Sequence, residues 1–245
     1  MEEIIYNTAA IVLAGGKGKR MGSDVPKQYM TVCGRPLLYY TLKAFEESFI
    51  EKVYVVCAKG DEKFCRQEFV EKYGFTKICG ITCGGCERYH SVWQGLEYVK
   101  QQGGTEVVFI HDGARPFVDS GILHRCYEDA IKYGSGIAAV PSKDTVKLAD
   151  ADGFVKSTLK RENAYLMQTP QTFEFTGIYR AYEDLILKED EIKKTGVMIT
   201  DDAMVMEYFT DKNVKLSIGN YKNIKITTPE DLEYMEYAIN KKSDR

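Results

Sequence analysis

The sequence contains no uninterrupted apolar run of about 18 residues, which is the length that a membrane-spanning helix requires. Its first residues, MEEIIYN, carry acids where a secretory signal would carry basic residues followed by an apolar stretch. Lys and Arg number 33 against 36 Asp and Glu, so the net charge of −3 provides no general attraction to nucleic acid or to an anionic membrane. We therefore expect a cytoplasmic protein that binds neither nucleic acid nor membrane.

A disulfide framework is also missing. The seven cysteines are odd in number and scattered, which favours reduced thiols. Cys79, Cys83 and Cys86 nevertheless form the C-x3-C-x2-C spacing by which radical enzymes hold a four-iron cluster. Against an iron-sulfur enzyme, a strand predicted through Cys79 and Cys83 would separate them by about 13 Å. The same separation argues against a zinc site, which also lacks an obvious fourth ligand.

What the sequence does contain is a repeated order of short Val- and Ile-rich runs, each followed by a helical pattern. Continuous apolar strands of this kind are buried on both faces, so we predict an α/β fold with a mostly parallel sheet flanked by helices. No linker, internal repeat or low-complexity tract interrupts residues 1–245, which we interpret as a single domain. Strands are expected at 9–13, 53–57, 78–82 and 106–110, and helices at 36–47, 61–73, 87–101 and 120–133.

After Val140 the pattern changes to alternation, with runs at 145–148 and 154–159 on either side of an Asp-Gly pair that is typical of a hairpin turn. The hairpin has too few large apolar residues to bury itself. We therefore expect residues 141–163 to form a projecting arm that packs on a second subunit. Further strands are expected at 165–168, 214–218 and 224–226, and helices at 175–187, at 201–209 and from Pro229 onwards.

The first predicted strand is followed by a glycine-rich, basic loop over residues 14–27. Ligands of such sheets bind beyond the carboxyl ends of the strands, and glycines allow the backbone to approach an anion closely. Arg20 and Lys27 add positive charge. The loop fits neither a Walker motif, which needs Ser or Thr after Gly-Lys, nor a dinucleotide-binding turn that leads straight into a helix. We interpret it as the binding site of a nucleoside triphosphate.

Two other loops at the predicted strand ends carry reactive residue types. Asp112 follows the fourth strand, where a carboxylate facing a phosphate loop is well placed to hold Mg²⁺, and we predict that it is a metal ligand rather than only a turn-capping residue. His111 is expected to be packed or hydrogen-bonded, and Arg115 to support the loop. After the third strand, Gly84 and Gly85 suit backbone contacts to a nucleotide base, with Ser91 as a further donor.

Together these segments resemble the 2-C-methyl-D-erythritol 4-phosphate cytidylyltransferases. Each segment is weakly specific, but seven occur in the family's order over nearly the whole chain. They are LAGGxGxRM at 13–21 with PKQ at 26–28, GGxER at 84–88 with SV at 91–92, HDGARP at 111–116, KDT at 143–145, QTPQTF at 168–173, TDDA at 200–203 and NIKITTPEDL at 223–232.

The resemblance implies a Rossmann-like nucleotidyltransferase fold and a Mg²⁺-dependent homodimer that transfers CMP from CTP to 2-C-methyl-D-erythritol 4-phosphate. It implies that Arg20 and Lys27 are catalytic. The CTP-binding residues would be Ala14, Gly15, Gly16, Gly18, Gly85, Ser91 and Asp112. The sugar-phosphate residues would be Arg115, Thr145, Arg161, Thr169 and Lys225, with Thr145 and Arg161 supplied by the arm of the partner subunit.

Two features leave alternatives open. Cys86 stands where relatives commonly carry Asp, so only a backbone contact to the nucleotide is expected there. The LAGG start also resembles the sister family that makes CDP-ribitol, so ribitol 5-phosphate is the alternative acceptor. A non-catalytic nucleotide-binding protein is disfavoured, because Arg20, Lys27 and Asp112 are all retained.

Overall fold

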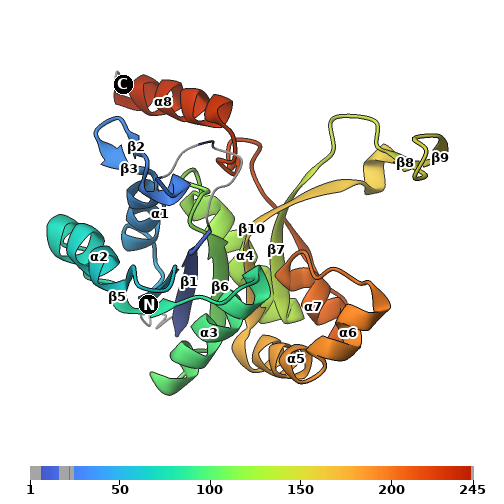
Figure 1. Ribbon diagram of the computed structural model, residues 1–245, viewed down its shortest axis with the longest axis horizontal. Helices are drawn as coiled ribbons and strands as arrows, with labels where there is room; N and C mark the ends of the chain where they lie inside the picture. Colours follow the sequence, from blue (N-terminus) through green and yellow to red (C-terminus); the bar gives the residue numbers. More distant parts are fainter. Residues whose placement is uncertain (1–6, 17–21, 23–24, 244–245) are drawn as a thin grey trace.

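The computed structural model describes residues 7–16, 22 and 25–243. Its main feature is a seven-stranded sheet in the order β11-β7-β10-β6-β1-β4-β5, with β1 and β6 near the middle (Figure 1). The strands are β1 (Thr8–Ala14), β4 (Lys52–Cys57), β5 (Ile78–Cys83), β6 (Val107–Asp112), β7 (Ser135–Pro141), β10 (Tyr165–Glu174) and β11 (Leu216–Ile218).

The sheet is mostly parallel, as the sequence predicts. The strands β1, β4, β5 and β6 pair in parallel, and β11 pairs in parallel with β7. The exception is β10, which lies between β6 and β7 and is antiparallel to both. The sequence pattern predicts only a short strand at 165–168, whereas β10 continues to Glu174. Because β10 runs in the opposite direction to β6, an internal residue of β10, Thr169, lies at the edge of the sheet where β6 ends.

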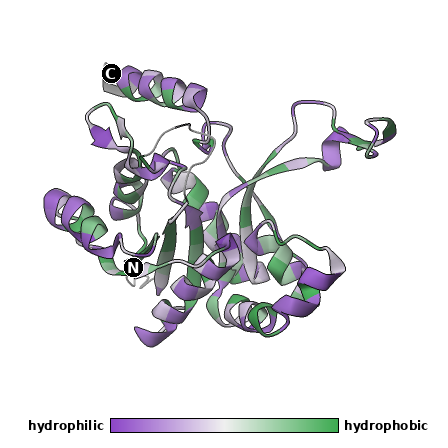
Figure 2. Ribbon diagram, in the orientation of Figure 1, coloured by the Kyte–Doolittle hydropathy of each residue, from purple (hydrophilic) through white to green (hydrophobic). Residues whose placement is uncertain are grey.

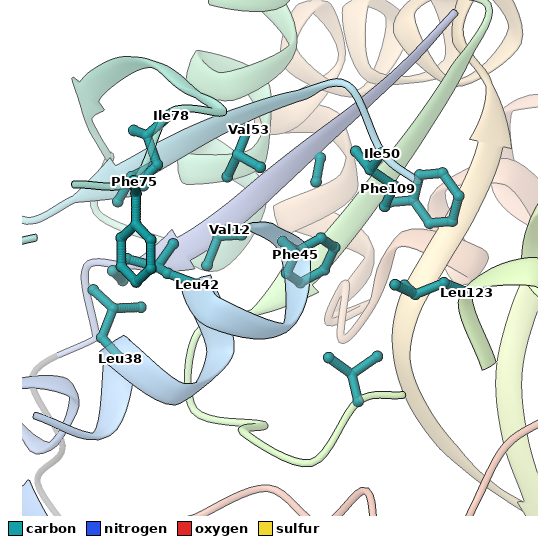
Figure 3. Packing of buried hydrophobic residues seen from close by; sticks show 14 of the residues in the cluster. Val12, Leu38, Leu42, Phe45, Ile50, Val53, Phe75, Ile78, Phe109 and Leu123 are labelled. Atoms are coloured by element: carbon teal, nitrogen blue, oxygen red, sulfur yellow. The ribbon is translucent and has the colours of Figure 1, made fainter. Parts of the chain in front are cut away.

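Helices cover both faces of the sheet. Alternate residues of β1 point to opposite sides, so Ala10 and Val12 join one apolar cluster while Ala9 and Ile11 join the other. The first cluster includes α1 and α4 and is drawn in Figure 3, and the apolar colouring of the central strands is visible in Figure 2. The helices are α1 (Leu37–Glu46), α2 (Glu62–Cys65), α3 (Arg88–Gln101), α4 (Ser120–Tyr133), α5 (Phe175–Leu187), α6 (Glu189–Thr195), α7 (Asp202–Phe209) and α8 (Pro229–Ser243).

A third, smaller cluster brings the end of the chain to the carboxyl edge of the sheet. Met235 of α8 and Ile226 pack with Val32 of β2 (Thr31–Val32), which forms a small hairpin with β3 (Arg35–Pro36). The N–H of Ile226 also donates to the carbonyl oxygen of Ala114 at 2.8 Å. The segment that precedes α8 is therefore held against the loop that follows β6.

The hairpin arm predicted between residues 141 and 163 is present as a separate two-stranded sheet. Its strands are β8 (Lys147–Ala149) and β9 (Val155–Thr158), which pair antiparallel and are exposed along their whole length. In Figure 1 the hairpin projects away from the main sheet. Three apolar side chains on it, Leu148, Phe154 and Val155, are 50%, 72% and 60% exposed.

The structure corrects several other predictions. The strand expected at 224–226 does not form. The N–H of Ile226 donates to the carbonyl oxygen of Ala114, and the N–H of Asn223 donates to the carbonyl oxygen of Asn220 in a turn. The helix expected at 61–73 is instead α2 followed by a π-helical segment, η3 (Arg66–Glu71). The strand β7 and the helix α6 were not predicted as elements. Within the described part of the chain, no helix is long and apolar enough to cross a bilayer.

Candidate active site

The carboxyl ends of the parallel strands meet along one edge of the main sheet. Ala14 is paired with Cys57, and Cys57 with Cys83. On the other side of β1, Leu13 is paired with Asp112. The three loops with unusual chemistry therefore leave the sheet side by side, as expected for ligand-binding loops of a parallel sheet.

The glycine-rich loop begins at this edge. Ala14 is buried at the end of β1, Gly15 is partly buried and Gly16 is exposed. The side-chain N–H of Gln28 donates to the carbonyl oxygen of Ala14 at 2.6 Å, which ties the far end of the loop to the strand where it starts. Gly18 and Arg20, both predicted to bind the triphosphate, lie outside the described residues.

Lys27 begins the short 3-10 helix η2 (Lys27–Tyr29) at the far end of the same loop. Its Nζ donates to the carbonyl oxygen of Ile226 at 2.9 Å. Ile226 immediately follows Lys225, which is predicted to bind the sugar phosphate. Lys27, which is assigned to the triphosphate, therefore contacts the backbone next to Lys225, which is assigned to the acceptor.

The turn after β5 is shaped by contacts with the first turn of α3. The N–H of Gly85 donates to Ser91 Oγ at 3.2 Å, so the two residues predicted to bind the nucleotide contact each other. A Cβ on Gly84 would lie 2.5 Å from Ser91 Oγ, and one on Gly85 would lie 2.4 Å from the Cβ of His90. Glycine is therefore required at both positions by close packing. Cys86 is exposed beside this turn.

Asp112 lies at the centre of a group of cations. Lys225 Nζ is 2.9 Å from Oδ2, and Arg115 Nε is 3.5 Å from the same oxygen. Arg88 Nε is 3.5 Å from Oδ1. Burial alone would raise the pKa of this carboxyl, but the positive charges of Arg88, Lys225 and Arg115 outweigh it and hold the pKa well below its usual range. Asp112 is therefore ionised throughout the physiological range.

His111 has a structural position, as sequence analysis expected. The N–H of Asp112 donates to Thr169 Oγ1 at 3.0 Å, and Thr169 Oγ1 lies 3.1 Å from His111 Nδ1. With its proton on Nε2, which is 3.1 Å from the carbonyl oxygen of Arg115, His111 accepts from Thr169 and donates to Arg115. Burial lowers the pKa of His111 to about 4, so the ring is neutral at pH 7.

Arg115 connects the same loop to the segment before α8. Its Nη1 donates to the carbonyl oxygen of Asn223 at 2.9 Å. Asn223 is fully buried, and its side-chain N–H donates to the carbonyl oxygen of Thr169 at 2.8 Å. Arg115, Thr169 and Lys225, three residues predicted to bind the sugar phosphate, thus form one connected group around Asp112.

The other two predicted sugar-phosphate residues are not part of that group. Arg161 Nη2 donates to Thr145 Oγ1 at 3.0 Å, so both belong to the arm and contact each other. Both are exposed, and the hairpin that follows Thr145 extends away from the carboxyl edge of β1 and β6 (Figure 1). Within this chain, Thr145 and Arg161 make no recorded contact with Asp112 or Lys225 among the described residues.

Sequence reasoning assigned no role in the site to one buried ion pair. Arg88, the first residue of α3, forms two hydrogen bonds with the fully buried carboxylate of Asp202, the first residue of α7. The preceding residue, Asp201, caps α7 by accepting from the N–H of Met204. Arg88 and Asp202 are 114 positions apart in the sequence, and no local pattern indicates their contact.

The described residues bring few metal-ligating side chains together at this site. No group of three or more His, Cys, Asp or Glu side chains that could hold a metal ion occurs among the described residues, which include Cys79, Cys83 and Cys86. The described residues therefore lend no support to an iron-sulfur or zinc centre on those cysteines. A single carboxylate at Asp112 is compatible with Mg²⁺, which is commonly bound by one or two carboxylates together with substrate phosphates. Asp112 Oδ1, which among the described residues contacts Arg88 Nε at 3.5 Å, is the oxygen that could serve.

Comparisons with known proteins agree with this geometry. The family model described as "IspD: 2-C-methyl-D-erythritol 4-phosphate cytidylyltransferase" matches residues 8–241. Enzymes of that name from Lachnoclostridium phytofermentans and Lachnospira eligens are 41% and 45% identical, covering 96% and 91% of this chain and 97% and 95% of theirs. A crystal structure of the corresponding synthase from Anaerococcus prevotii has a TM-score of 0.80 and 32% identity, covering 96% of this chain and 99% of its own. These matches lend no support to a ribitol phosphate acceptor.

The hydrogen bond that places Asp112 can be tested through stability. We expect Thr169→Val to lower the free energy of unfolding by about 1–3 kcal/mol, because the buried N–H of Asp112 would lose its acceptor. Thr172→Val is the matched control, since Thr172 is also buried but its Oγ1 makes no hydrogen bond among the described residues. Urea denaturation of both variants measures the difference. Equal stability of the two would contradict this role for Thr169.

Proposed function

This chain belongs to the family of 2-C-methyl-D-erythritol 4-phosphate cytidylyltransferases, and from that premise we propose which residues perform each part of its reaction. The enzyme transfers CMP from CTP to 2-C-methyl-D-erythritol 4-phosphate and releases pyrophosphate, a step of non-mevalonate isoprenoid biosynthesis. The observation that best supports the residue assignment is the cationic group around Asp112, where the three loops at the carboxyl edge of the sheet meet.

In this proposal CTP lies across the ends of β1 and β5. The triphosphate binds the glycine-rich loop, where Ala14, Gly15, Gly16 and Gly18 offer backbone N–H groups to the phosphates. The cytosine and ribose lie toward Gly85, Ser91 and Asp112. The contact between Gly85 and Ser91 supports this arrangement, because it holds the turn after β5 in one shape before a base arrives.

The sugar phosphate binds on the opposite side of Asp112. Arg115, Thr169 and Lys225 come from this chain, and Thr145 and Arg161 come from the arm of a partner subunit. Arg88, Arg115 and Lys225 are opposed by the carboxylates of Asp112 and Asp202, which leaves one net positive charge. Lys27 lies beside this group through its bond to Ile226 and adds a second charge. Such a group can attract two phosphorylated substrates.

The reaction is an in-line displacement at the α-phosphorus of CTP. An oxygen of the acceptor's phosphate forms the new bond to phosphorus, and the bond to the pyrophosphate oxygen breaks. The attacking phosphate is already ionised near neutral pH, so no general base is needed and the task of the protein is to position the reactants and neutralise charge. Arg20 and Lys27 do this on the departing phosphates, while Arg115 and Lys225 hold the attacking one.

A bound Mg²⁺ would supply charge neutralisation between the triphosphate oxygens, and Asp112 is the residue that would hold it. This carboxylate is ionised, because the neighbouring cations hold the pKa of Asp112 well below its usual range. The remaining ligands would be phosphate oxygens and water. Cys86 would contribute only its backbone to the nucleotide.

We further propose that the enzyme is a cytoplasmic homodimer of single-domain subunits joined by the arm at 141–163. Exposed apolar side chains on the hairpin, such as Phe154 at 72%, are what an arm that packs against another surface would carry. Thr145 and Arg161 have no described partner in the site of their own chain, which fits residues that complete the site of a partner.

The first test concerns the acceptor. We expect CTP with 2-C-methyl-D-erythritol 4-phosphate to release pyrophosphate stoichiometrically with 4-diphosphocytidyl-2-C-methyl-D-erythritol, and CTP with ribitol 5-phosphate to release essentially none. Both are followed by coupled pyrophosphate detection and by mass spectrometry of the product. Turnover with ribitol 5-phosphate alone would show that the assigned acceptor is wrong.

The second test concerns Lys27. We expect Lys27→Ala to lower kcat on the order of 100-fold while the fold survives, because a preorganised charge next to the departing phosphates is lost. Lys43→Ala is the control, since Lys43 is an exposed residue of α1 that pairs only with Glu47 among the contacts recorded for it. Circular dichroism verifies folding of both variants. A kcat for Lys27→Ala similar to that of Lys43→Ala would refute a catalytic role.

The third test concerns the arm. Phe154→Ser should shift the protein toward monomer in analytical ultracentrifugation, whereas Leu187→Ser, at a 77% exposed position on α5, should not. If Arg161 acts in the partner's site, mixing Arg161→Ala and Lys225→Ala chains, each of strongly reduced activity at low sugar-phosphate concentration, should restore about one quarter of wild-type activity, because mixed dimers hold one intact site. Recovery of no activity by the mixture, while each variant still dimerises, would argue against a shared site.

A further inference from the structure

We propose that Arg88 is a positioning residue for the acceptor side of the site, and that Asp202 is the buried anchor that holds it there. The inference rests on the proposed sugar-phosphate side formed by Arg115 and Lys225. Arg88 itself lies at the start of α3, next to the turn assigned to cytosine, so its neighbours in the sequence would suggest a role in binding CTP. The contacts of its side chain point instead to Asp112.

The guanidinium group of Arg88 uses its planar donor geometry to join two carboxylates. Nη1 and Nη2 donate to Asp202 Oδ1 and Oδ2 at 2.8 and 2.7 Å, while Nε faces Asp112 Oδ1 at 3.5 Å. An arginine can make these contacts simultaneously because its donors are fixed in one plane. A lysine ammonium could satisfy one carboxylate or the other. The geometry therefore requires arginine, and not only a positive charge.

Asp202 is fixed independently of Arg88. Its carboxylate is fully buried and also accepts from the hydroxyl of Tyr182 on α5. The backbone N–H groups of Asp202 and Ala203 donate to Gln171 Oε1 at 2.8 and 2.9 Å, which fastens the start of α7 to β10. Asp202 therefore holds the guanidinium group of Arg88 in place from outside the substrate site, and Arg88 in turn limits the movement of the Asp112 carboxylate.

The consequence for Asp112 is a fixed carboxylate with different partners on its two oxygens. Lys225 lies against Oδ2 at 2.9 Å, and Arg88 lies on the side of Oδ1. Arg115 Nε, which is buried and makes no hydrogen bond among the described residues, depends on the same carboxylate for its 3.5 Å ion pair. Since Asp202 neutralises Arg88, the charge of Asp112 remains available to Lys225 and Arg115. Loss of Arg88 would let the carboxylate turn and misplace both cations.

The first experiment separates the two substrates. We expect Arg88→Lys to raise the KM for 2-C-methyl-D-erythritol 4-phosphate by about 10-fold or more, which is typical for loss of a residue that orients a ligand-binding group, and to change the KM for CTP by less than about 2-fold. Arg180→Lys, at an exposed position on α5, is the matched control and should change neither value. A rise confined to the KM for CTP would show that Arg88 serves the cytosine turn, and unchanged KM values would likewise overturn the proposal.

A second variant separates positioning from folding. Replacement of a buried ion pair by apolar residues of similar size commonly preserves stability. The combined variant Arg88→Met, Asp202→Leu, Tyr182→Phe should therefore melt close to the wild-type Tm yet keep the raised KM for the sugar phosphate. Recovery of wild-type kinetics would show that the ion pair serves only the fold. Failure of both this variant and Arg88→Lys to fold would also contradict the proposal, because it would assign the pair to folding.

Kinetic measurements on Lys225→Ala distinguish a failure of the role proposed for Arg88 from a failure of the proposed sugar-phosphate side. A raised KM for the sugar phosphate in Lys225→Ala together with wild-type kinetics in Arg88→Lys would overturn the role of Arg88 alone. An unchanged KM in Lys225→Ala would remove the proposed sugar-phosphate side, and with it the inference about Arg88.

Discussion

The site depends on one buried carboxylate surrounded by cations. Asp112 terminates β6 at the edge where the ends of β1 and β5 also lie, and it pairs with Arg88, Arg115 and Lys225. Without it, three positive charges would repel each other in a partly buried space, and their hydrogen-bonding groups would lack a common partner. With it, the start of α3, the loop after β6 and the segment before α8 are held in one arrangement. The net positive charge that is left suits phosphorylated substrates.

Most of the fold could be predicted because its signals are local. Apolar runs of strand length followed by helical periodicity identify the parallel half of the sheet, and α5 begins and ends at the residues predicted for it. The Asp-Gly turn identified the arm. The predictions failed where tertiary contacts determine the structure. Strand β10 extends past its expected end because it is paired on both sides. The strand expected at 224–226 is absent, and the N–H of Ile226 donates instead to the loop after β6.

The site was predictable to the extent that strand ends converge and motifs resemble those of a known family. This reasoning assigned Gly85 and Ser91 to one nucleotide site, and the two residues contact each other. It assigned Asp112 and Lys225 to different substrates, whereas the two form an ion pair. It could not find the contact between Arg88 and Asp202, because no periodicity or spacing connects residues on two helices so far apart in the chain. His111 could be assigned a packed position but not its bond to Thr169, which exists only because β10 runs antiparallel to β6.

The insertion of β10 between β6 and β7 also constrains the order in which the chain can fold. On a ribosome, β1, β4, β5 and β6 emerge first and can assemble as a parallel sheet, but one edge of β6 stays unpaired until the arm and β10 have been synthesised. Strand β7, which precedes β10 in the sequence, has no neighbour in the finished sheet other than β10 and β11. The nascent protein therefore carries an open sheet edge while residues 113–174 are synthesised, a period in which it would depend on protection from association with other chains.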